Sequence, residues 1–448
     1  MTAFDDHHRP ARALIGDCVH CGFCLPACPT YLLWGEEMDS PRGRILLMDA
    51  AERGEVSLTP TLVGHWDACL GCMACETACP SGVRYGRLIE QTRQQVERRH
   101  RRPLRQRALR GALFAVLPHA LPLRGIATAL WGYRATGLQR ALRSTGMATR
   151  LPEALQRADA LAPVISARAL VERAPRHLAA TGRPRMRVAM LTGCVQRAFF
   201  GDVNAATARV LAGFGAEVVA PRQGCCGALE LHVGRETGAL RRARGLIDAL
   251  ERTGADRIAV NSAGCGSVMK EYGELLADDG VWAARAARLA ARVADVSEVL
   301  CELGVPPHTL HPLPMRVAYQ DACHLVHAQR VRAQPRALLA AIPGVELVAL
   351  DEGDVCCGSA GVYNLLQTQA ADALGERKAA RIRQAAPDAL VAGNPGCLTQ
   401  IGAWLSRTGE PVPTFHPVEL VDASLLGVVS TSLLAQRRAL LTSAGHCR

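Results

Sequence analysis

The sequence predicts an α+β multidomain protein, in which a helical N-terminal domain precedes two duplicated α/β modules built on parallel sheets. Three observations lead to this fold class. The first 100 residues hold two dense groups of cysteines, with helix signals between and after them. After residue 185, short apolar runs alternate with helical segments, which favours parallel sheets. A cysteine pattern in that region recurs at a nearly constant offset, which indicates a duplication.

The composition is that of a globular protein, because 49% of the 448 residues are hydrophobic and 21% are charged. The N-terminal stretch MTAFDDHHRPARALI carries acidic residues and a proline where a secretory signal would carry a basic and then an apolar run. We therefore expect a cytoplasmic protein. Cytosolic thiols are kept reduced, so the 18 cysteines favour metal ligation over disulfides.

The two N-terminal cysteine groups share the spacing C-x2-C-x2-C-x3-C-P. In bacterial two-cluster ferredoxins with this spacing, the first three cysteines of one motif and the fourth of the other hold each 4Fe-4S cluster. A pair of zinc sites also needs eight thiolates, but it explains neither the third cysteine nor the proline. We therefore predict two 4Fe-4S clusters, the first held by Cys18, Cys21, Cys24 and Cys79, and the second by Cys69, Cys72, Cys75 and Cys28.

Helix signals surround the two motifs. Between them, SPRGRILLMDAAERG offers Ser40 as an N-cap, Pro41 as the first helical residue and Gly54 just past the end. After the second motif, VRYGRLIEQTRQQVERRHRR predicts another helix that stops before Pro103. Residues 1–100 are accordingly assigned to a helical ferredoxin-type domain, and residues 101–184 to an Arg-rich helical linker.

The basic charge is concentrated around this linker. The segment 87–150 holds fourteen arginines and two glutamates, a net charge of +12 against +11 for the whole chain. A solvated linker would explain this excess, and so would peripheral association with the cytoplasmic face of the inner membrane. The membrane interpretation places the centre of contact at Arg98, Arg99, Arg101 and Arg102. Nucleic acid is not expected, since the segment lacks regularly interleaved aromatic residues and a reading-helix signature.

The duplicated part repeats one cysteine pattern. Cys194, Cys225, Cys226 and Cys265 recur as Cys323, Cys356, Cys357 and Cys397 at offsets of 129 to 132 residues. The runs RVAMLTG, RIAVNSAG, RVAYQDA and ALVAGNPG each lead into one of these cysteines and are predicted to be strands. Parallel α/β sheets bind ligands beyond the carboxyl ends of their strands, so we expect the thiols to gather there. The modules are assigned to residues 185–312 and 313–448.

The two CC doublets require turns. Adjacent side chains on a strand point to opposite faces, and the glycines that follow, Gly227 and Gly358, supply the permissive backbone of a turn. The prediction is a further cluster or another metal at these eight cysteines; the alternative is inert packing in the core. Cys301 and Cys447 fall outside both patterns, and we expect no ligand role for them.

At these residues the chain resembles the iron–sulfur subunits of glycolate oxidase, anaerobic glycerol-3-phosphate dehydrogenase, lactate-utilisation complexes and heterodisulfide reductases. The resemblance is closest to glycolate oxidase, on the strings CVHCGFCLPACPTY, DSPRGRI, CETACPSGVRY, NAATARVL, GCCGALELH, SAGCGSVMKEYG and CCGSAGVYNL. In the heterodisulfide reductase type each module ends in C-x2-C. Here Cys265 is followed by GSV and Cys397 by LTQ, which argues against that type of cluster.

The resemblance implies an electron-transfer subunit with no catalytic residue of its own. Flavoprotein partner subunits carrying FAD would oxidise glycolate to glyoxylate, and a membrane quinone would be the final acceptor; the cysteine-rich modules would be a docking surface for the flavoproteins or a further redox station. The chain itself lacks a G-x-G-x-x-G motif and a phosphate-binding loop, so it should not oxidise the CH–OH donor alone.

Three alternatives stay open. The same relay could serve lactate or glycerol-3-phosphate oxidation. The chain could be a thiol–disulfide reductase with the CCG modules as its active site. It could also be a non-catalytic binding protein that carries clusters.

Overall fold

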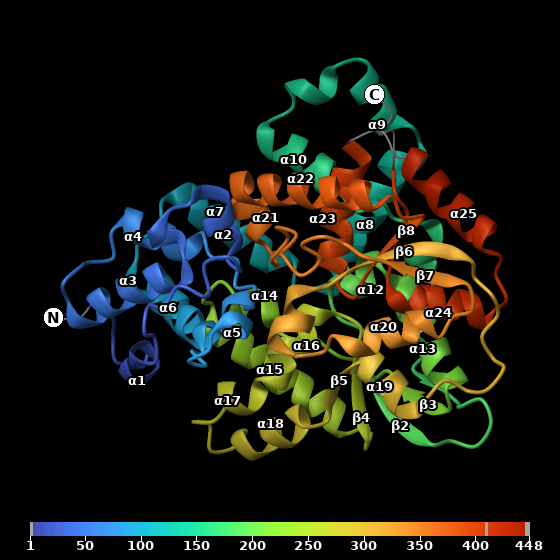
Figure 1. Cartoon of the computed structure of the whole chain (residues 1–448), viewed down its shortest axis with the longest axis horizontal. Helices are drawn as coiled ribbons and strands as arrows, with labels where there is room; N and C mark the ends of the chain where they lie inside the picture. Colours follow the sequence, from blue (N-terminus) through green and yellow to red (C-terminus); the bar gives the residue numbers. More distant parts are fainter. Residues whose placement is uncertain (1–2, 408–410, 444–448) are drawn as a thin grey trace.

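The computed structural model describes residues 3–407 and 411–443, and it has a helical N-terminal part beside two sheet-containing modules (Figure 1). The N-terminal part consists of α1 (Arg12–Gly16), α2 (Pro29–Trp34), the 3-10 turn η1 (Glu37–Asp39), α3 (Pro41–Arg53), α4 (Pro60–Asp67), α5 (Ala74–Ala78) and α6 (Tyr85–Arg99). The predicted start of α3 is confirmed, because Ser40 Oγ accepts a hydrogen bond from the Gly43 amide at 3.0 Å. Its predicted end is confirmed too, since Gly54 follows the helix with a φ of 76°. Helix α6 ends at Arg99, short of Pro103.

The linker is helical, as expected. It consists of α7 (Leu104–Val116), α8 (Ala120–Ala135), α9 (Leu138–Ser144), the 3-10 turn η2 (Met147–Arg150), α10 (Glu153–Leu161) and α11 (Ala167–Val171). One side of α8 is buried, with Leu123 packed against the first module and Ala127 against α11. Among the described helices, none is both long and apolar enough to cross a bilayer by itself; α7 and α8 reach that length only together, and they meet at an angle of 96°.

The first module contains a five-stranded sheet in the order β1-β3-β2-β4-β5. Its strands are β1 (His177–Leu178), β2 (Met186–Leu191), β3 (Ala216–Val219), β4 (Arg257–Val260) and β5 (Val293–Asp295), all parallel except β1. The helices around it are α12 (Val195–Phe199), α13 (Gly201–Gly213), α14 (Ala228–Leu231), α15 (Glu236–Glu251), α16 (Ala263–Lys270), α17 (Tyr272–Leu275), α18 (Ala283–Ala290) and α19 (Val296–Leu303).

The second module repeats this order of strands as β7-β6-β8-β9, all parallel. The strands are β6 (Met315–Gln320), β7 (Val345–Val348), β8 (Ala389–Ala392) and β9 (Thr414–Phe415). Its helices are the π-helical turn η3 (His324–Ala328), α20 (Ala333–Ala340), α21 (Tyr363–Leu366), α22 (Thr368–Ala385), α23 (Pro395–Arg407), α24 (Pro417–Leu425) and α25 (Ser430–Ser443). The predicted fold class, including the duplication, is therefore confirmed.

The two modules share one hydrophobic core. It contains side chains from both sheets, such as Val188, Met190, Val317 and Val391. The central strands β2 and β8 are buried along most or all of their length, as is typical of parallel strands covered on both faces. Helices α13 and α24 pack against each other between the modules, and the Arg209 guanidinium pairs with Asp422 at 2.6 Å. This packing fixes how the two sets of strand ends face each other.

Candidate metal centres

The structure brings Cys28 of the first motif into a cavity with the first three cysteines of the second motif. Cys28, Cys69, Cys72 and Cys75 line this cavity together and are all buried. Cys28 reaches it because it directly precedes α2, whose first residue is Pro29. The crossed assignment of the second cluster requires this placement. That these thiols bind iron remains a prediction.

The other four N-terminal cysteines lie nearer the surface. Cys18, Cys24 and Cys79 are half-buried and pack against the hydrophobic core of the N-terminal domain, whereas Cys21 is exposed. The two predicted sites therefore differ in accessibility, one being at the surface and the other enclosed.

The chemistry of the enclosed thiols fits a metal. Burial raises the pKa of Cys72 and Cys75 well above that of an exposed thiol. Burial also acts to raise the pKa of Cys69, but the Arg44 and Arg93 guanidiniums and the hydrogen bonds from Tyr85 and Gly71 together lower it below its ordinary value. Four buried thiolates need compensating positive charge, and bound iron supplies it.

The eight cysteines of the modules line one cavity of about 300 Å³. Cys194 and Cys323 follow β2 and β6, the CC doublets follow β3 and β7, and Cys265 and Cys397 follow β4 and β8. Corresponding cysteines therefore follow corresponding strands in the two modules. The thiols lie together at the carboxyl ends of the strands, as expected.

Within this cavity the thiols form two contiguous groups of four. Sγ of Cys194 donates to Sγ of Cys225 at 3.4 Å, and Cys226 is hydrogen-bonded to both Cys225 and Cys265. In the second module, the Sγ atoms of Cys323 and Cys356 are 4.0 Å apart. Cys357 is hydrogen-bonded to both Cys356 and Cys397, so the four thiols are connected in the same order as in the first module. Each module therefore presents a row of four thiols, whose spacing suits a small cluster better than a single metal ion.

The glycines after the doublets hold the turns that the sequence predicts. Gly227 has a φ of 88° and Gly358 a φ of 84°. A Cβ atom at Gly227 would lie 2.9 Å from the carbonyl oxygen of Ala239, and one at Gly358 would lie 2.7 Å from that of Ala371. Both the backbone conformation and the close approach of the next helix therefore require glycine.

The rest of the cavity wall is mainly apolar and comes from both modules and the linker. Leu117 and Leu161 belong to the linker, and Phe199, Leu229 and Leu365 to the modules. Six of the eight thiols are buried, namely Cys194, Cys225, Cys226, Cys356, Cys357 and Cys397. The thiols therefore face a cavity, and the expectation that the modules are a docking surface for the flavoproteins or a further redox station stays a prediction.

The second N-terminal motif packs directly on the second module. Leu70 and Cys72 share a hydrophobic cluster with Cys356 and Tyr363. The Tyr363 hydroxyl donates to the Ala68 carbonyl at 2.8 Å. The neighbouring loop is held by a second bond, from His324 Nε2 to the Gly71 carbonyl at 2.9 Å. The enclosed N-terminal site therefore adjoins the thiol-lined cavity.

Comparison with known proteins agrees with this arrangement. Residues 15–83 match a 4Fe-4S dicluster domain, residues 188–270 and 317–402 match a cysteine-rich domain, and residues 105–162 match the linker region of the glycolate oxidase iron–sulfur subunit. The glycolate oxidase iron–sulfur subunit of Escherichia coli (strain K12) is 36% identical over 437 residues, which cover 94% of this chain and 98% of that protein. The chain belongs to the glycolate oxidase iron–sulfur subunit family.

Other relatives extend the comparison. The probable glycolate oxidase iron–sulfur subunit of Bacillus subtilis (strain 168) is 37% identical over 397 residues, or 88% of this chain and 89% of that protein. Lactate utilization protein A of Halalkalibacterium halodurans is 28% identical over 53% of this chain and 97% of that protein. As a member of this family, the chain is an iron–sulfur protein with an electron-transfer role in an oxidoreductase complex.

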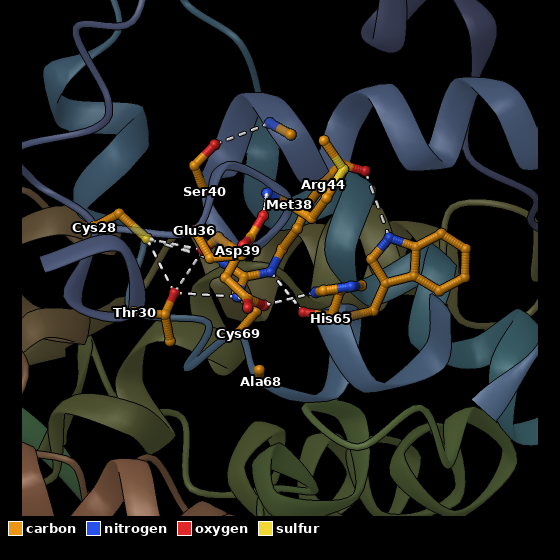
Figure 2. A network of polar contacts seen from close by, with 12 residues as sticks. Cys28, Thr30, Glu36, Met38, Asp39, Ser40, Arg44, His65, Ala68 and Cys69 are labelled. Carbon is orange, nitrogen blue, oxygen red and sulfur yellow. Dashed lines mark hydrogen bonds and ion pairs between the residues drawn. The ribbon is translucent and has the colours of Figure 1, made fainter. Parts of the chain in front are cut away.

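Sequence reasoning missed a buried arginine beside Cys28. Arg44 is 1% exposed; it donates to Asp39 Oδ1 and Thr30 Oγ1 at 3.1 Å each, and its NH1 lies 3.9 Å from Cys28 Sγ (Figure 2). His65 Nδ1 is 3.1 Å from the same Asp39 oxygen. This network fixes the one cysteine that must cross from the first motif to the second site. The signal in the sequence is an arginine in line with Ile45, Met48 and Ala51 on the mainly apolar side of the predicted helix.

Two of the four arginines that were expected to contact a membrane form ion pairs with carboxylates of the chain. Arg98 pairs with Asp5 at 3.0 Å and with Glu236 at 3.4 Å, and Arg102, 8% exposed, pairs with Asp67 at 2.5 Å. Arg98 therefore links Asp5 and the first module to α6, and Arg102 is held by Asp67, whereas peripheral membrane association itself stays a prediction.

Two cysteines, Cys301 and Cys447, fall outside both cysteine patterns. Cys301 is exposed, and its thiol donates to the Gln334 carbonyl at 3.7 Å, away from both thiol groups. Cys447 lies outside the described residues.

Proposed function

We propose that this chain is the electron relay of a complex in which flavoprotein subunits, with FAD, oxidise glycolate to glyoxylate and a membrane quinone accepts the electrons. The observation that carries the proposal is the contact between the second N-terminal motif and the second module, which makes the thiol sites of the chain continuous. Iron–sulfur clusters, when bound, accept and donate single electrons. The names of the relatives support glycolate as the donor, with lactate as the alternative.

The surface of the first motif suits the incoming partner. Val19 and Phe23 are each 67% exposed beside the exposed Cys21. Exposed apolar side chains around a site are typical of protein interfaces. The flavoprotein subunits would dock here, and electrons would leave through the enclosed second motif.

The thiol-lined cavity is the proposed place where the acceptor is reduced. Its apolar wall fits the ring of a quinone, which carries few polar groups. The eight thiols also favour a second candidate function, reduction of a disulfide substrate at the same place. Activity of the isolated chain on a disulfide would support that candidate.

We further propose that the chain associates peripherally with the cytoplasmic face of the inner membrane, through the outer side of α8. Three large apolar side chains of α8 are exposed, Leu121 at 82%, Ile126 at 42% and Trp131 at 37%, at positions spaced around the helix, and Arg124 is exposed among them. Arg105 and Arg107 on α7 are exposed, and no acidic residue occurs between residues 97 and 153. Exposed apolar side chains among arginines suit an anionic lipid interface.

Vesicle flotation tests this contact. Replacing Leu121 and Ile126 together by serine should weaken binding to anionic vesicles by roughly tenfold or more, because their apolar surface no longer enters the lipid. The control Val281→Ser, at a position 71% exposed in the first module, should bind as the wild type does. Equal binding of all three proteins, or equal binding to neutral and anionic vesicles, would count against the proposal.

The relay itself is tested by breaking the predicted crossed ligation. Cys28→Ala and Cys79→Ala should each remove one ligand from the cluster whose other ligands lie in the opposite motif. In the assembled complex, glycolate should still reduce the flavin, but quinone reduction should collapse. Cys301→Ala serves as the control with normal turnover. Normal quinone turnover in both variants would refute the relay.

A further inference from the structure

A row of ionisable side chains leads from the surface to the thiol-lined cavity. At the surface, Glu274 pairs with Arg84 at 2.7 Å and with Arg87 at 2.9 Å. Glu271, just before α17, interacts electrostatically with both Glu274 and Glu90, and Glu90 is on α6. The row ends at two histidines, His232 and His324, which line the cavity.

Glu90 is the buried middle of this row. It is 8% exposed, and its Oε1 makes no hydrogen bond within the described residues. Burial raises the pKa of Glu90 to about 7; Arg93 and Arg87 lower it, while Glu76 and Glu274 raise it further. Burial and the Glu90 charge likewise raise the pKa of Glu271 well above its usual range, with Arg84 opposing. Glu90 therefore titrates near neutral pH, beside a second carboxyl group whose pKa is also raised.

His232 joins Glu90 to the cavity. Its Nδ1 lies 3.4 Å from Glu90 Oε1, and its ring centre lies 4.8 Å from that of His324. His232 Nε2 is buried and has no hydrogen-bond partner among the described residues. Burial and the charge of Arg93 lower the pKa of His232 to about 4, so the ring is neutral at pH 7. A neutral imidazole accepts a proton at one nitrogen and releases one from the other.

We propose that Glu90 and His232 form a proton path from the surface carboxylates to the thiol-lined cavity. The inference rests on the proposed function, because reduction of a quinone to a quinol consumes two electrons and two protons. The electrons come from glycolate, which loses two electrons and two protons in becoming glyoxylate at the flavoprotein. The two protons taken up at the cavity enter from solvent at Glu274 and pass along Glu271, Glu90 and His232.

The apolar wall explains why such a path is needed. The cavity is lined largely by aliphatic and aromatic side chains and thiols, which are poor proton donors to an organic acceptor at neutral pH. The Glu90 and His232 pair brings an exchangeable proton to this wall without opening it to bulk water. His232 is 16% exposed and reaches solvent poorly by itself. Glu90 is therefore the group that connects it with the surface.

Infrared spectroscopy tests the path without any turnover. The C=O stretch of a protonated carboxyl should be present in the wild-type chain at pH 6 and lost by pH 8, and Glu90→Gln should lack that change. The matched control is Glu97→Gln, on the same helix, whose carboxylate pairs with Arg102 and Arg110. A titrating band that persists unchanged in Glu90→Gln would overturn the assignment of the proton to Glu90.

Two electron acceptors separate proton delivery from electron transfer. In the assembled complex, Glu90→Gln should slow quinone reduction at least tenfold while leaving the reduction of ferricyanide, which takes no proton, at the wild-type rate. Glu97→Gln should change neither rate. Wild-type rates with both acceptors in Glu90→Gln would overturn the proton path alone. A wild-type complex that reduces ferricyanide but no quinone would overturn the proposed function.

Discussion

Replacing Arg44 by methionine should destabilise the N-terminal domain by about 3–5 kcal/mol, the usual effect of breaking a buried ion pair. Its guanidinium is 1% exposed, and its partner Asp39 has a side chain 12% exposed. Methionine keeps much of the volume but leaves the carboxylate of Asp39 without the Arg44 cation and with His65 as its neighbouring side-chain partner. The free energy lost is therefore mainly that of an uncompensated buried charge.

A matched control lies two residues away on the same helix. Arg42 pairs with Glu37, but the two side chains are 29% and 39% exposed, so Arg42→Met should cost less than about 1 kcal/mol. Urea unfolding of the anaerobically purified proteins, followed by circular dichroism, measures both values. Adding Asp39→Asn to Arg44→Met should recover part of the loss. Equal losses in the Arg42 and Arg44 variants would refute the reasoning.

Three further predictions concern the doublets, the bound metal and pH. Gly358→Ala should cost about 1–3 kcal/mol in the urea unfolding of the protein, since its φ is positive and the added Cβ meets a carbonyl oxygen, whereas Gly224→Ala, with open space around it, should be neutral. Anaerobic removal of iron should increase hydrogen exchange in α2 and α5 next to the enclosed site, and unchanged exchange would contradict a metal there. The folded state holds a proton on Glu90 up to about pH 7, whereas the unfolded chain releases it near 4.5. The unfolding free energy of the wild type should therefore fall relative to Glu90→Gln by about 3 kcal/mol between pH 4 and pH 8, and parallel pH profiles would contradict this.

Local signals in the sequence predicted much of the fold. The cap at Ser40 and the glycine at position 54 define α3, and the apolar runs before the module cysteines are strands. These features depend on residues close together in the chain. The same is true of the turn at Gly227, whose backbone requirement is visible in the doublet itself.

Features that depend on distant partners were missed or misjudged. Arg98 and Arg102 were expected at a membrane because their partners, Asp5 and Asp67, are far away in the sequence. The convergence of both modules on one cavity likewise follows from how the sheets pack, and no single segment encodes that packing. The burial of Glu90 beside the first module depends on the same kind of long-range contact, here with His232.

The enclosure of the second N-terminal site has a consequence for biogenesis. Cys69, Cys72 and Cys75 are buried, and the loop that carries them is capped by Tyr363 and its neighbours from a segment almost 300 residues later. Iron and sulfide therefore have to reach these thiols before that late segment closes over them. Synthesis from the N-terminus provides this order, because residues 1–100 leave the ribosome while the cap has yet to be translated. Because the segment around Tyr363 is synthesised late, the second N-terminal site stays open for cluster assembly during translation.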